Sequence, residues 1–125
     1  MIFGIGTDLV SIERVEALRR RHGTRALEKL LAPEERAACN ASHFPGRFLA
    51  KRFAAKEALG KALGTGIRVP VLLPAIAVVH DAQGKPAFVF ANNLADWITE
   101  RRLLAHLSIS DEATHALAFV VIEQT

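Results

Sequence analysis

The sequence predicts a single α+β domain over residues 1–125, in which an antiparallel sheet packs against one long helix. Three observations lead to this fold class. The length of 125 residues is usual for one domain. A helical stretch begins at Pro45 or Gly46 and continues to about Leu63. Pairs of short apolar runs, joined by turn-forming residues, are typical of β-hairpins.

An apolar run at residues 2–10 predicts a buried strand at the start of the chain. Ser11 then suits an N-cap, and residues 12–22 have the spacing of an amphipathic helix that Gly23 ends. Acidic residues come early in this helix and the run Arg19-Arg20-Arg21-His22 comes late, an order that complements the helix dipole. The basic run therefore has a structural explanation, although three consecutive arginines exceed what a dipole requires.

Two short helices are expected before the long one. Thr24 is a candidate cap for a helix that ends at Leu31, and Pro33 suits the first turn of the next helix. A loop at residues 40–45 then leads to the long helix.

The second half of the chain predicts two hairpins with a helix between them. Asn92 or Asn93 can cap this helix, which is expected to end near Arg102. Prolines argue against a central strand at residues 68–74. The four strands of the hairpins are expected at residues 75–80, 86–90, 106–110 and 115–123.

Composition narrows the class of protein. Cys39 is the only cysteine, which excludes an internal disulfide and fits a reducing compartment. No apolar run approaches the roughly 20 residues that span a bilayer, and the first residues lack the charged region of a signal peptide. The sequence therefore predicts a soluble, cytoplasmic protein with no membrane partner.

Charge is distributed unevenly along the chain. Residues 1–68 contain 13 Lys and Arg against 7 Asp and Glu, a balance of +6, whereas the remainder contains 3 against 6, a balance of −3. The field of a basic half attracts an anionic partner: a nucleic acid, a nucleotide, a membrane surface or an acidic protein. Solvated helix faces explain the same charges, and charge alone does not choose between these explanations.

The segment Phe53-Ala-Ala-Lys-Glu-Ala-Leu-Gly-Lys-Ala-Leu-Gly-Thr-Gly66 carries the strongest chemical signal. Glu57 and Lys61 are four residues apart, so a helix places them on one face. The helix then stops at Gly64, where glycines let a backbone approach a ligand. This combination indicates phosphate chemistry. An ion pair between Glu57 and Lys61, and a simple helix stop, are the structural alternatives.

Asp8 adds a second carboxylate at the end of the first strand. If the long helix packs beside this strand, Asp8 and Glu57 converge. Two carboxylates without cysteine or paired histidine ligands favour Mg²⁺, which takes one or two protein carboxylates together with waters and substrate phosphates. Considered singly, Asp8 as a helix cap and Glu57 as the partner of Lys61 are the favoured explanations.

Taken together, these motifs resemble the holo-acyl-carrier-protein synthases, the small 4'-phosphopantetheinyl transferases. The resemblance rests on the blocks at Gly4–Val15 and Phe53–Gly66 and extends to His106–Asp111 and Ala116–Glu123, so it covers nearly the whole chain. It implies a 4'-phosphopantetheinyl transferase-like fold. It also implies that 4'-phosphopantetheine moves from coenzyme A to a serine of an acyl carrier protein, with release of adenosine 3',5'-bisphosphate.

The resemblance implies a role for particular residues. Asp8 and Glu57 are expected to bind the catalytic Mg²⁺, and Glu57, or a water that it holds, is the expected base for the serine hydroxyl. Lys61, Gly64 and His106 are expected to contact the coenzyme. From the pattern alone, the strand face that His106 shares with Ser108 and Ser110 suits nucleotide or solvent equally. Further candidate phosphate contacts, some of which would only solvate the helix, are Lys51, Arg52 and Lys56.

The resemblance also implies two partners. The basic first helix is expected to receive acyl carrier protein through Arg14, Leu18 and Arg21, and the family commonly forms a homotrimer with active sites between subunits. A nucleic-acid-binding module is the second hypothesis, but stacking aromatic residues are not interleaved with the arginines, so no nucleic acid is expected. A third hypothesis is a docking protein that binds an acidic partner without turnover.

Overall fold

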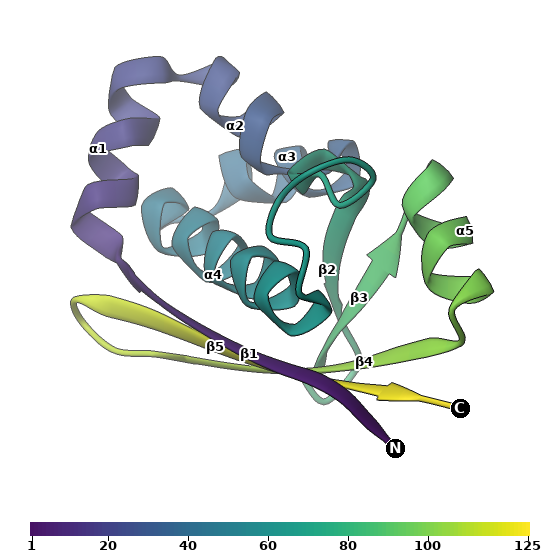
Figure 1. The fold of residues 1–125 in the computed structure, drawn as a ribbon. Helices are drawn as coiled ribbons and strands as arrows, with labels where there is room; N and C mark the ends of the chain where they lie inside the picture. The colour runs from purple at the N-terminus through teal and green to yellow at the C-terminus, as the bar shows by residue number, and fades with distance from the viewer.

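The computed structural model describes all 125 residues. Helices and strands follow one another as drawn in Figure 1. In chain order they are β1 (Ile2–Ser11), α1 (Ile12–His22), α2 (Thr24–Leu30), α3 (Pro33–Ala41), α4 (Pro45–Leu63), a 3₁₀ turn η1 (Leu73–Ala75), β2 (Ile76–His80), β3 (Pro86–Phe90), α5 (Asn92–Glu100), β4 (Leu103–Asp111) and β5 (His115–Gln124).

Three of the strands form one antiparallel sheet in the order β1-β5-β4. The first and last strands of the chain are therefore neighbours, and β4 and β5 form the expected hairpin. The other predicted hairpin, β2–β3, makes a separate two-stranded sheet. The α+β class with an antiparallel sheet is confirmed.

Helix α4 lies across one face of the three-stranded sheet (Figure 1), as the sequence predicted. The strands alternate accordingly: in β5, Ala116, Ala118, Val120 and Ile122 are buried, and the residues between them face outward. The last three of these share one core cluster with small residues of α4, which include Ala54, Ala55, Ala58 and Ala62. These alanines allow the helix to lie close to the sheet.

Two glycines of β1 bring α4 closer still. A Cβ atom added at Gly6 would overlap the carbonyl oxygen of Ala58, and one added at Gly4 would overlap that of Ala62. The Gly-Ile-Gly sequence is therefore required by backbone packing between strand and helix. Asp8 follows Gly6 by two residues on the same strand face. The contact at Gly6 therefore sets how close Asp8 lies to α4.

The predicted start and end of α1 are confirmed. The Ser11 side chain accepts a hydrogen bond from the Arg14 amide at 3.3 Å, and Gly23 ends the helix with its amide bonded to the Arg19 carbonyl. Thr24 was wrong as a cap, because Gly23 itself is the N-cap of α2 and its carbonyl accepts from the Ala26 amide. One glycine thus ends α1 and begins α2, and no separate cap residue is left.

The asparagine caps were also wrong. Ala91 is the N-cap of α5, without a side-chain hydrogen bond, and Asn92 is already the first helical residue. The amide of Ala91 instead donates to the Ala75 carbonyl, so the cap is held by the turn η1 that precedes β2. Most other boundaries are within one or two residues of prediction. The exception is β4, which begins at Leu103, three residues before the predicted start. No helix is both long enough and apolar enough to cross a membrane.

Candidate functional site

The predicted convergence of β1 and α4 takes place at Asp8. Strand alternation places Asp8 on the same face as Gly4 and Gly6, toward α4. The Nζ atom of Lys61 lies 3.1 Å from Oδ1 of Asp8 and donates to the Thr7 carbonyl at 2.9 Å. Lys61 therefore pairs with Asp8 across the two elements. The alternative of a pair with Glu57 on its own helix is wrong.

Glu57 lies one helical turn before Lys61 and is half-buried. Burial raises the pKa of the Glu57 carboxyl, the nearby charge of Asp8 raises it further, and Lys61 opposes both effects. Asp8 and Glu57 are thus close enough to repel each other when both are ionised. A cation between them would relieve this repulsion.

Both carboxylates line one cleft of about 370 Å³. Its apolar wall comes mainly from the end of β1 and the start of α1, and it includes Val10, Val15 and Leu18. Phe53, one turn before Glu57 on α4, completes the wall. Sequence reasoning missed Phe53 as a site residue, although its spacing of four from Glu57 puts both on one helix face. The cleft thus combines two carboxylates with an apolar wall.

The side chains at this centre fit a hard divalent cation. No group of three or more His, Cys, Asp or Glu side chains gathers anywhere in the structure. A cation held by Asp8 and Glu57 would take its other ligands from water or from a bound phosphate, which is the coordination that Mg²⁺ prefers. The donor set does not fit a thiolate- or imidazole-bound metal.

Gly64 and Gly60 have different structural roles. Gly64 caps α4 in the left-handed conformation, at φ 78°, and its amide bonds to the carbonyls of Gly60 and Lys61. A Cβ added there would meet nothing within 4 Å. The tight approach is instead at Gly60, where a Cβ would lie 3.0 Å from the Gly66 carbonyl carbon. Gly60 thus lets the loop fold back on the helix.

His106 is not brought to the two carboxylates within this chain. It lies on β4, two strands from β1, and it points outward from the face opposite α4. Its ring Nε2 lies 2.6 Å from Oε1 of Glu123 on β5. The alternation of His106 with Ser108 and Ser110 on the exposed face is as the sequence predicted.

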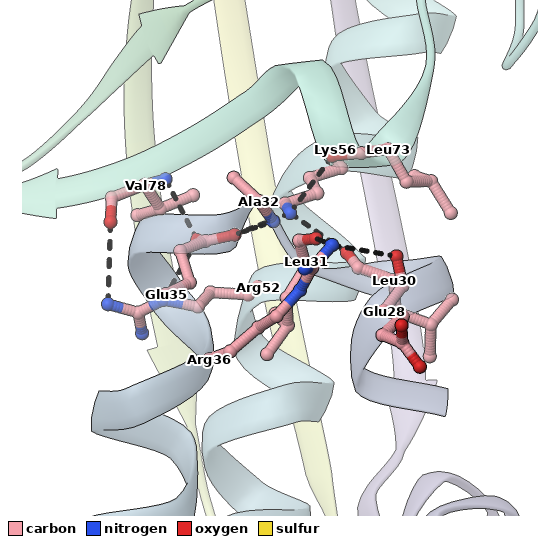
Figure 2. Close-up of polar contacts among 10 residues, drawn as sticks. All are labelled: Glu28, Leu30, Leu31, Ala32, Glu35, Arg36, Arg52, Lys56, Leu73 and Val78. Carbon is pink, nitrogen blue, oxygen red and sulfur yellow. Dashed lines mark hydrogen bonds and ion pairs between the residues drawn. The ribbon is translucent and has the colours of Figure 1, made fainter. Parts of the chain in front are cut away.

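Two of the three additional phosphate candidates are buried. Lys56 is fully buried and Arg52 nearly so, and both are paired with Glu35 of α3. Figure 2 shows these side chains surrounded by the chain, and none of them lines the cleft. They are therefore unavailable to a phosphate. Sequence reasoning missed Glu35 as the partner of these cations. Glu35 lies 21 residues before Lys56 and belongs to another helix.

The three predicted docking residues lie on the exposed side of α1. Arg14, Leu18 and Arg21 are all exposed, and neither arginine takes part in an ion pair. Arg19 and Arg20 both pair with Glu16, which accounts for part of the basic run structurally. Arg14 and Arg21, the arginines of α1 that form no ion pair, are thus the two that were expected to bind a partner.

Leu18 also connects two hollows of the surface. It lines the cleft that contains Asp8 and Glu57, and it lines a second hollow of about 540 Å³ beside α2. Arg25 and Lys29 border this second hollow. One basic, partly apolar surface therefore runs from α2 along α1 to the carboxylates.

Known proteins share this architecture and sequence. The family model of the 4'-phosphopantetheinyl transferase superfamily matches residues 4–120. The chain is 56% identical over 123 residues to a holo-acyl-carrier-protein synthase from Azoarcus sp. (strain BH72), covering 98% of each chain.

Solved structures agree. The crystal structure of the holo-acyl-carrier-protein synthase from Neisseria meningitidis superimposes with a TM-score of 0.95 at 46% identity, covering 99% of this chain and 100% of that one. The synthase from Bacillus anthracis str. Ames, solved in complex with CoA (3',5'-ADP), gives a TM-score of 0.84 at 35% identity, covering 100% and 99%. The chain therefore belongs to the holo-acyl-carrier-protein synthases, enzymes of the 4'-phosphopantetheinyl transferase superfamily.

Proposed function

We propose that this enzyme transfers 4'-phosphopantetheine from coenzyme A to a serine of apo-acyl carrier protein and releases adenosine 3',5'-bisphosphate. The observation that carries the proposal is the shared cleft, which is lined both by Asp8 and Glu57 and by Arg14 and Leu18 of α1. An anionic substrate and an acidic protein can thus reach one centre together. The coenzyme bound to the related Bacillus anthracis structure supports the same substrate here.

Asp8 and Glu57 would hold Mg²⁺. When bound, this ion supplies charge neutralisation to the pyrophosphate of the coenzyme. Lys61 is within reach of the same centre and, once released from Asp8, can pair with a phosphate oxygen as a point charge. The raised pKa of Glu57 suits it to accept the proton of the serine hydroxyl, directly or through a water. Gly64 stays a predicted backbone contact one turn beyond Lys61.

Arg14, Leu18 and Arg21 are proposed to bind acyl carrier protein. Two free arginines on either side of an exposed leucine match an acidic partner that also buries an apolar side chain. Because Leu18 lies at the rim of the cleft, a carrier bound there presents its serine near Glu57.

We also propose that copies of this chain assemble through the outer face of the three-stranded sheet into a homotrimer. This face carries exposed apolar side chains on all three strands, an unusual feature for a face in contact with water. They are Phe3, Ile5, Leu9, Leu104, Leu117 and Phe119. His106 lies on the same face, so its predicted contact with the coenzyme requires a site between subunits.

The test is to incubate the protein with coenzyme A, Mg²⁺ and apo-acyl carrier protein, then to weigh the carrier by intact mass spectrometry. We expect the carrier to gain one phosphopantetheine group, and the gain to disappear with a chelator. Asp8→Ala and Glu57→Ala should each abolish turnover with the fold retained. Asp96→Ala, which removes an exposed carboxylate on α5, is the matched control and should be fully active.

Other outcomes would contradict the proposal. Unchanged turnover in both variants or in chelator would exclude the metal site. Binding of the carrier without any gain in mass, with several carriers tried, would favour the docking protein. Specific binding of RNA or DNA that weakens steeply with salt would favour the nucleic-acid module.

A further inference from the structure

Glu35, a buried carboxylate outside the cleft, pairs with two cations, Arg52 and Lys56. Glu35 of α3 is 3% exposed, Arg52 is 9% exposed and Lys56 is fully buried. The Nζ atom of Lys56 lies 2.7 Å from Oε1 of Glu35 and also donates to the carbonyls of Leu30 at 2.9 Å and Leu73 at 3.2 Å. All three protons of the ammonium group are therefore used (Figure 2).

Glu35 is equally saturated. Its Oε1 atom also accepts from the Ala32 amide at 2.8 Å, and Oε2 accepts from the Val78 amide at 3.0 Å. Arg52 Nε lies 3.1 Å from Oε2, close enough for an ion pair but without the alignment of a hydrogen bond. The Arg52 guanidinium also stacks over the ring of Phe48 at 3.8 Å. One carboxylate thus connects α3, α4 and β2.

Stability alone does not explain this network. Burial lowers the pKa of both Lys56 and Arg52, so the fold works against the two charges even though Glu35 favours them. Apolar side chains of similar volume often stabilise a protein as well as a buried ion pair does. An apolar contact tolerates several orientations of the helix, whereas an ion pair demands one.

The orientation of α4 matters because Lys56 and Glu57 are consecutive residues of this helix. Consecutive helical residues point about 100° apart, so the anchor of Lys56 on one side of α4 determines where Glu57 points on another. The contact of α4 with the sheet is made largely by alanines such as Ala54, Ala58 and Ala62. Small side chains resist rotation of the helix about its axis less than large ones do, and buried leucines of α4 share this task. The network of Glu35 adds a constraint that also has direction.

We propose that Lys56, held by Glu35, is a positioning residue that directs Glu57 toward Asp8. The proposal rests on the proposed function, in which Glu57 and Asp8 share a cation. Lys56 itself touches no substrate, because it is fully buried and does not line the cleft.

The test compares Lys56→Met and Glu35→Asp with the wild type. Methionine keeps the length of the side chain without the charge, and aspartate keeps the ion pair but draws Lys56 toward α3. The first readout is Mn²⁺ affinity of the protein without coenzyme, measured by electron paramagnetic resonance. The second is kcat and KM for coenzyme A. Circular dichroism and the Tm establish that each variant is folded.

We expect both variants to lose about tenfold or more in Mn²⁺ affinity and in kcat, the scale seen when residues that orient metal ligands are removed. The KM for coenzyme A should change less than kcat. Arg47→Met is the matched control, because it breaks an ion pair with Asp111 at the other end of the same helix. It should leave the Mn²⁺ affinity unchanged.

The inference would be overturned if either variant, once shown to be folded, kept Mn²⁺ affinity and kcat within twofold of the wild type. If Lys56→Met does not fold, Glu35→Asp decides the question alone. Glu57→Gln separates the two proposals. If this variant keeps normal Mn²⁺ affinity and turnover, the proposed site is wrong. If it loses both while Lys56→Met loses neither, only the positioning role is wrong.

Discussion

At the scale of single residues, Glu57 of the candidate site works against the stability of the fold. Burial and the charge of Asp8 raise its pKa, so the fold favours the protonated carboxyl. A raised carboxyl pKa means that the native state is less stable once pH exceeds the pKa of the unfolded chain, and the penalty is complete above the native pKa. Lys61 offsets this penalty only in part, because it is bonded to Asp8.

We therefore expect Glu57→Gln to raise the Tm at pH 7 in the absence of metal, on the order of 1–3 °C. The gain should shrink as pH falls and should vanish near pH 4, about the pKa of an ordinary glutamate. Differential scanning calorimetry at several pH values checks this. Glu100→Gln, at an exposed carboxylate of α5, should show no such pH-dependent gain. A Tm of Glu57→Gln that is unchanged or lower at pH 7 would contradict the expectation.

At the scale of elements, the site depends on the contact between β1 and α4. Gly4 and Gly6 let the strand touch the backbone of the helix, and no other residue type fits without movement. Asp8 follows on the same strand face, so the carboxylate moves with any shift of the strand. The glycines of this motif therefore act through packing.

Gly6→Ala should destabilise the protein by about 1–3 kcal/mol, the usual cost of overpacking. It should also lower turnover, because the added methyl group pushes Asp8 away from Glu57 and Lys61. Chemical denaturation gives the loss of stability and the mass-spectrometric assay gives the loss of activity. Thr7→Ala, at the exposed neighbouring position, should change stability by less than about 0.5 kcal/mol. Equal stability of the two variants would argue against the packing role.

At the scale of the whole molecule, two surfaces of different chemistry lie on different elements. The outer face of the three-stranded sheet is apolar, with Phe119 exposed on the central strand and Ile5 exposed on an edge strand. The exposed side of α1 is basic, and it lies at the rim of the cleft. Assembly through the sheet would thus leave α1 free for an acidic carrier.

Phe119→Lys should dissociate the proposed trimer, because a charge on the face of each copy would be buried without a partner. Analytical ultracentrifugation at micromolar concentration measures the change in mass. Turnover should fall with it if His106 completes a site on a neighbouring copy. Val69→Lys, at an apolar residue that is exposed on the loop before η1, should leave the mass unchanged. A wild-type protein that sediments as a monomer would refute the assembly.

Local patterns in the sequence were sufficient for most elements. The alternation in β5 and the spacing of Glu57 and Lys61 depend only on residues close in the chain, and so they predicted strand, helix and shared face. The resemblance of the Asp8 and Glu57 blocks predicted the family, which the comparisons confirm.

The tertiary structure alone decided which groups meet. Periodicity shows which side of a helix is apolar or charged, but it does not show what packs there. The sequence therefore made Lys56 a candidate phosphate contact, whereas the structure pairs it with Glu35, from a helix earlier in the chain. In the same way, only folding showed that Lys61 pairs with Asp8 and that His106 faces away from both carboxylates. The physical reason is that chain connectivity governs local conformation, whereas burial and charge pairing depend on neighbours that the sequence keeps apart.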